Sequence, residues 1–181
     1  MASASNREII GKGNAGIPRD FFQVGFHAYE SGLSGESVLY CHMTPEQIEL
    51  RDSNEPQLVF RARYNRLQKT VGFYIRTVSK ESGQHHPDLF AGQLFDQTIV
   101  YFGEQGPLTK IQAEWFPWSV NYQQFYTALG NRSFADMTAR HEAATHTWTA
   151  EQARRNRFSV VKSVLSIREP QKILTVFEKA A

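Results

Sequence analysis

The chain has 181 residues, of which 41% are hydrophobic and 13% aromatic, and its formal net charge is +2. Because that much apolar surface can offset the chain entropy lost on folding, the composition excludes a disordered protein. The single cysteine, Cys41, excludes an internal disulfide and a multi-thiolate metal site. The length suits one core, so we predict a single domain over residues 1–181, with residues 1–10 flexible.

The first half of the chain carries mainly strand signals. Residues 38–42 predict a short strand, and residues 44–51 combine a capping box with a proline, which predicts a short helix. Apolar residues alternate with Val59, Arg61 and Arg63 over residues 58–64. After a run of turn residues, Val71, Phe73 and Ile75 alternate with Tyr74 and Arg76. We expect an antiparallel hairpin with one apolar and one partly basic face.

A helix and a strand follow. Apolar residues recur with the spacing of one helix face, which predicts a helix that Pro87 begins and Gly103 ends. Residues 110–115 alternate apolar and polar side chains, which predicts a half-buried strand. The predicted buried positions of the helix are Phe90, Leu94, Phe95, Thr98, Ile99 and Phe102.

The last third of the chain predicts three helices and a second hairpin, from its capping residues, glycine stops and alternation. The predicted ranges are a helix from Asn121 to Gly130, a helix over 134–146, a helix that restarts after 147–149 with Thr149 as its cap and ends near Asn156, and strands over 160–167 and 173–177. The fold class is therefore α+β, with helices packed on an antiparallel-rich sheet.

Three side chains are candidates for acid–base chemistry. His86 precedes the predicted start of a helix, where backbone N–H groups favour an anion. Glu114 lies on the polar side of its strand and is either a solvated carboxylate or, under a second helical layer, a buried functional one. His146 completes the set of catalytic candidates.

His141, Glu142 and His146 resemble the zinc motif H-E-x-x-H, but the second histidine lies one position too far along. Five residues of helix turn the two rings about 140° apart, so they do not share a face. We predict no metal site and no cofactor.

Two further groups of residues could bind a partner. Arg61, Arg63 and Arg76 share strand parity and could form a basic patch for a phosphodiester backbone, or a solvated sheet face. Trp118 and Trp148 could stack on a ligand, or close the core.

A set of residues between positions 86 and 177 forms a diffuse pattern whose most distinctive part is Thr147-Trp148-Thr149. Its members are Gly106, Ile111, Glu114, Trp115, Asn121, Phe125, Gly130, Ala143, Ala144, Thr147, Trp148, Thr149, Ala153 and Phe158. The pattern resembles C-terminal modules of bacterial polymorphic-toxin and secreted-effector-like proteins. It departs from them at Ala150 and Arg157, where such modules commonly have glycine.

The resemblance implies a bacterial secreted effector or toxin-like virulence protein that binds a partner protein in a target cell. A nuclease-like enzyme on a polyanion is the alternative, using His86 with Glu114 or His146. An intracellular ligand-binding or interaction module without catalysis is the third hypothesis. We expect a cytoplasmic location in the producing cell, no membrane span, and any export to proceed without a classical signal peptide.

Overall fold

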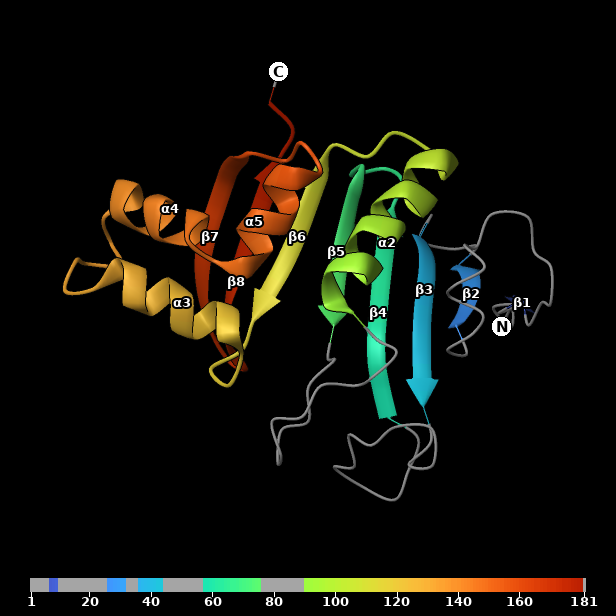
Figure 1. Cartoon of the computed structure of the whole chain (residues 1–181), viewed down its shortest axis with the longest axis horizontal. Coiled ribbons are helices and arrows are strands. Elements are labelled where there is room, and N and C mark those ends of the chain that lie inside the picture. Colours follow the sequence, from blue (N-terminus) through green and yellow to red (C-terminus); the bar gives the residue numbers. More distant parts are fainter. Residues whose placement is uncertain (1–6, 10–25, 32–35, 44–56, 76–89, 181) are drawn as a thin grey trace, which may run out of the picture. The chain divides into compact units, whose positions relative to one another are not determined.

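A computed structural model describes the backbone of residues 7–9, 26–31, 36–43, 57–75 and 90–180, and the side-chain environments of residues 60–75 and 90–180 (Figure 1). The chain divides into two compact units, residues 1–108 and residues 109–181. The predictions for residues 44–51 and 76–89, which include Pro87, lie outside the described residues.

The described residues of the first unit form five strands in the order β1-β2-β3-β4-β5, and each neighbouring pair is antiparallel. The sequence analysis predicted no strand at the residues of β2. The strands are β1 (Arg7–Ile9), β2 (Phe26–Ser31), β3 (Glu36–Met43), β4 (Gln57–Asn65) and β5 (Thr70–Ile75).

The β4–β5 hairpin confirms the predicted pairing and its two faces. Phe60, Ala62 and Tyr64 are fully buried on one face, whereas Arg63 on the other face is exposed. In the turn, the side-chain oxygen of Asn65 accepts the backbone N–H of Gln68 at 2.9 Å. This local hydrogen bond is the kind that makes asparagine a turn residue.

The predicted helix is α2 (Ala91–Gln105), and its predicted end at Gly103 is wrong. It begins four residues after Pro87, with Phe90 as the N-cap, and Gly103 lies inside it. Glycine costs a helix about 1 kcal/mol but does not end it. The helix ends at Gly106 because Pro107 cannot continue it.

Helix α2 buries most of the predicted face. Leu94, Phe95, Thr98 and Phe102 are buried, whereas Phe90 is exposed and Ile99 is partly exposed. Phe90 was predicted wrongly because it precedes the first helical turn. The buried face packs on the hairpin through stacked rings of Phe73 and Phe95, 4.5 Å apart, and through Tyr64 and Phe102, 5.4 Å apart.

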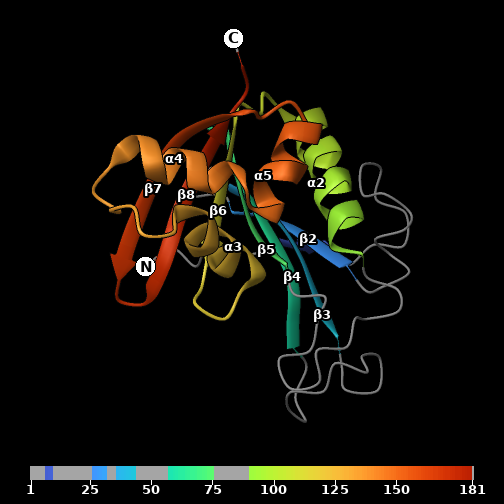
Figure 2. The same ribbon diagram turned by 60° about the vertical axis from the view of Figure 1, so that its left-hand side comes forward.

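The second unit contains three strands in the order β6-β8-β7, all antiparallel, and three helices. Figures 1 and 2 show the helices on the same side of these strands. The elements are β6 (Lys110–Trp115), α3 (Val120–Leu129), α4 (Met137–Thr145), α5 (Trp148–Arg155), β7 (Val160–Arg168) and β8 (Gln171–Glu178).

The structure confirms the α+β class, and it confirms the predicted hairpin of β7 and β8 and the strand β6. That the whole chain is one domain stays a prediction. None of the described helices is both long and apolar enough to cross a membrane.

Three helix starts were predicted wrongly by one to three residues, because the sequence offers several capping side chains close together. Ser119 caps α3, which was predicted to begin at Asn121, and Asp136 caps α4, which was predicted to begin at residue 134. Thr147 rather than Thr149 caps α5. Gly130 ends α3 as predicted, at a φ of 59°.

We expect Gly106→Ala to destabilise the fold by about 1–3 kcal/mol, because the added methyl group would meet the buried side chain of Tyr64. A Cβ atom at position 106 would lie 2.8 Å from the Tyr64 hydroxyl oxygen, and that hydroxyl donates to the Pro107 carbonyl at 2.8 Å. Gly103→Ala is the matched control: no atom lies within 4 Å of its added Cβ, and it should stabilise α2 by up to about 1 kcal/mol. Denaturant midpoints that fall equally for both variants would contradict this packing.

Leu94→Ala should cost about 2–5 kcal/mol, the usual range for truncating a buried aliphatic side chain. Ile99→Ala should cost less, because Ile99 is partly exposed in the same helix. Urea denaturation of both variants measures the difference, and an equal loss would mean that the buried face of α2 is wrongly assigned.

Candidate functional site

Paired side chains form the core face of the second unit's strands. Ile111 pairs with Phe177, and Trp115 pairs with Ile173, and all four are buried. The Trp115 indole N–H donates to the Thr149 hydroxyl at 3.1 Å. This bond ties α5 to the sheet and fixes where the helical layer lies.

The first turn of α5 is held by side chains of neighbouring segments. The backbone N–H of Trp148 donates to the Gln124 side-chain oxygen at 2.7 Å, and that of Thr149 donates to the Asn121 side-chain oxygen at 2.8 Å. The N–H of Ala150 donates to the Thr147 hydroxyl at 3.2 Å. These donors are the ones that would otherwise bind an anion at a helix N-terminus.

The pattern that carries the family resemblance is therefore structural in this chain. Most of its members in the second unit are buried, Gly130 provides the left-handed stop of α3, and the Asn121 side chain accepts the backbone N–H of Thr149 in α5. The buried members are Ile111, Trp115, Phe125, Ala143, Ala144, Thr147, Thr149, Ala153 and Phe158.

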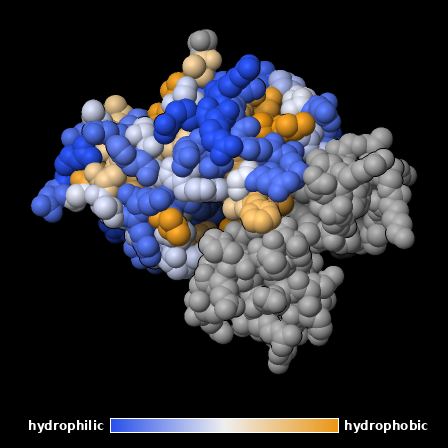
Figure 3. Space-filling view, in the orientation of Figure 1, coloured by the Kyte–Doolittle hydropathy of each residue, from blue (hydrophilic) through white to orange (hydrophobic). Residues whose placement is uncertain are grey.

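A groove of about 590 Å³ lies between α3 and α4. We refer to it as the α3–α4 groove. Hydrophilic surface predominates over the helices of the second unit, with small hydrophobic spots (Figure 3). The groove is lined by Val120, Gln123, Gln124, Thr127, Ala128, Arg132, Glu142 and His146.

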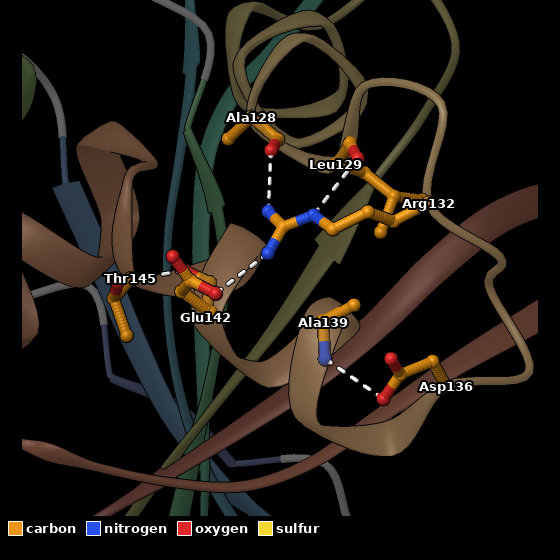
Figure 4. Close-up of polar contacts among 7 residues, drawn as sticks. All are labelled: Ala128, Leu129, Arg132, Asp136, Ala139, Glu142 and Thr145. Carbon is orange, nitrogen blue, oxygen red and sulfur yellow. Dashed lines mark hydrogen bonds and ion pairs between the residues drawn. The ribbon is translucent and has the colours of Figure 1, made fainter.

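Arg132 lines the groove, and Figure 4 shows its polar contacts. Its guanidinium donates to the carbonyls of Ala128 and Leu129 at 2.7 and 3.2 Å, and its remaining terminal nitrogen lies 2.6 Å from the Glu142 carboxylate. The carbonyls belong to the last turn of α3, where a cation also suits the helix dipole. The sequence analysis missed Arg132, although its position two residues after a glycine stop is a signal for such a cap.

His146 lies at the C-cap of α4, on the rim of the groove. Glu142 pairs with Arg132 rather than with this histidine. Burial, and then the neighbouring Arg140, lower the pKa of His141. Among the described residues, no three His, Cys, Asp or Glu side chains are grouped so that they could hold a metal ion.

Glu114 does not meet His146. It lies on the face of β6 that points away from the helices, and its carboxylate is 3.0 Å from the Lys172 ammonium. The same ammonium lies over the Phe116 ring, 5.9 Å from its centre. The carboxylate is therefore a paired surface group, the plainer of the two predicted roles.

The other predicted site residues lie in the first unit or outside the described residues. Arg61 and Arg63 share one face of β4, opposite the buried face, as predicted. His86 and Arg76 lie outside the described residues.

The predicted aromatic binding residues differ in exposure. Trp118 is 50% exposed and its ring stacks on Phe116, with centres 5.7 Å apart, whereas Trp148 is half-buried. On α3, burial and then the neighbouring Tyr122 raise the pKa of Tyr126 to about 12. The Tyr126 hydroxyl therefore stays protonated at neutral pH and is unsuited to act as a base.

No family model matches this sequence, and neither the curated proteins nor the solved structures include one that is detectably similar to it.

Asn121→Ala should destabilise the protein by about 1–2 kcal/mol, because it leaves the Thr149 N–H without its acceptor. Asn121→Asp keeps an acceptor oxygen and should stay within about 0.5 kcal/mol, since a carboxylate suits a helix N-terminus. Gln123→Ala, at an exposed position of the same helix, is the control. Thermal unfolding separates the three, and equal stability of the two Asn121 variants would argue against the cap.

Proposed function

We propose that this chain binds a partner protein through the α3–α4 groove and performs no chemistry there. The carrying observation is that the charged groups of the groove already satisfy one another. Arg132 and Glu142 are 2.6 Å apart, and the remaining guanidinium contacts go to the end of α3. A general acid or base must be able to exchange a proton with its substrate. Glu142 is instead paired with Arg132, and this ion pair links the end of α3 to α4.

His146 is the one acid–base candidate that lines the groove. Within the described part of the chain, no carboxylate forms an ion pair or hydrogen bond with its ring. An imidazole without an orienting partner lacks half of the usual catalytic arrangement. This supports recognition rather than catalysis.

The remaining lining is neutral. Gln123 and Thr127 offer side-chain donors and acceptors, and Val120 and Ala128 offer apolar surface. Such a mixture is typical of protein interfaces that form and dissociate, and the volume lies within the range of about 300–1,000 Å³ for binding pockets. We infer that the groove receives an extended segment of a partner that carries neutral polar side chains such as asparagine, glutamine, serine and threonine.

The role of an effector or toxin-like protein is supported by the resemblance of the second half of the chain alone. In that role the partner belongs to the target cell. The competing function is an enzyme that acts on a polyanion. The observation that favours it is that Arg61 and Arg63 place two cations on one face of β4.

The test places a photo-crosslinking benzoylphenylalanine at Gln123 inside the groove or at Met137, which is 60% exposed and outside it. We expect one specific cross-linked protein from position 123, none from 137, and loss of the product with Thr127→Arg, which fills the groove. The partner is then purified, and Thr127→Arg should weaken its binding at least tenfold at unchanged thermal stability.

Identical products from both positions, or a product that survives Thr127→Arg, would contradict groove binding. Growth of cells that express the wild type or His146→Ala provides the second readout. Loss of a toxic effect in His146→Ala, with the cross-linked partner retained, would mean that the site is catalytic.

A further inference from the structure

Strand β7 is the outer strand of the order β6-β8-β7, and in the described residues no strand pairs with its outer edge. It is nine residues long and contains neither proline nor glycine. An outer strand of this kind presents backbone N–H and C=O groups to a further strand. Its length and composition make it suitable for strand addition.

The side chains of β7 fit an added strand on both faces. Val164 is fully buried on the core face, whereas Leu165 on the other face is 49% exposed beside its cross-strand neighbour Leu174. An added strand could extend the apolar contacts of Leu165, because cross-strand neighbours on one face lie close together.

The edge is also cationic. Lys162 and Arg168 are exposed, and β7 contains no acidic residue. The Lys162 ammonium lies 3.7 Å from a carboxylate oxygen of Glu178, and the lysine side chain remains 62% exposed. Lysine on an edge also discourages unwanted pairing, so any accepted strand must supply opposite charge.

A second copy of the chain does not supply that charge. Antiparallel pairing of two β7 strands about Leu165 would place Lys162 of one copy opposite Arg168 of the other, which is destabilising. Pairing about Val164 would place Lys162 opposite Ser166 and Arg168 opposite Val160. Neither register gives either cation a counter-charge.

We propose that β7 accepts an extended acidic segment of a partner protein as an added strand, with carboxylates near both ends to meet Lys162 and Arg168. This surface is separate from the α3–α4 groove, and the inference does not depend on the function proposed for that groove.

Hydrogen exchange of the full chain tests the proposal with a synthetic nine-residue peptide that has glutamate near each end and alternating valine and threonine between. At saturating peptide, the amides of residues 160–168 that point away from β8 should exchange at least tenfold more slowly. The same peptide with lysine in place of glutamate should give no protection. Absence of protection by the acidic peptide, or equal protection by both, would overturn the proposal.

Charge reversal supplies the matched variants. Lys162→Glu/Arg168→Glu should weaken binding of the acidic peptide at least tenfold, as measured by fluorescence anisotropy, because two attractive cross-strand pairs become repulsive. Arg157→Glu/Lys179→Glu makes the same change in net charge at exposed positions outside β7 and should leave binding unchanged. Equal weakening by both double variants would mean a nonspecific charge effect and overturn the proposal.

Thr127→Arg should leave this peptide's binding unchanged, which keeps the test distinct from that of the groove. Without peptide, protection of residues 160–168 should not depend on protein concentration. Protection that rises with concentration would mean that a second copy of the chain pairs with β7, and it would overturn the proposal of an acidic partner.

Discussion

The buried indole N–H of Trp115 is the constraint on which the second unit depends. Trp115 is 1% exposed, and an unsatisfied buried donor costs about 1–3 kcal/mol, so its bond to the Thr149 hydroxyl fixes α5 against β6. The backbone of Thr149 in turn donates to Asn121 in α3. Thr149 thus links β6, α5 and α3. This linkage positions α3, which forms one side of the α3–α4 groove.

This linkage changes the meaning of the resemblance to toxin-like modules. Thr147, Trp148 and Thr149 are the most distinctive part of that pattern, but their polar groups form the first turn of α5 and accept the indole N–H of Trp115. A recurring pattern of this kind describes a framework, whereas function lies in sites placed on the framework. In the second unit we propose that those sites are the α3–α4 groove and the edge of β7.

Charged side chains in the second unit are used mainly in pairs at the ends of elements. Glu114 meets Lys172 across two strands, and Arg132 joins the end of α3 to Glu142 in α4. The Arg132–Glu142 pair is solvent-exposed and therefore contributes little to stability, whereas the Lys172 side chain of the other pair is only 16% exposed. With Arg132 and Glu142 paired, the rest of the groove lining is neutral apart from His146. On β7, the cations Lys162 and Arg168 are exposed.

The sequence by itself determined the elements whose periodicity is long and regular, such as β6 with Trp115 inward and the buried face of α2 around Leu94. Such patterns indicate which side of an element is buried, because the spacing of apolar residues along the chain sets the face on which they lie. Helix ends were less certain, because Thr147 and Thr149 are equally good caps until Trp115 takes the hydroxyl of one of them. The groove, and the separation of Glu114 from His146 by the sheet, were decided by tertiary structure alone, since both depend on which faces of distant elements meet.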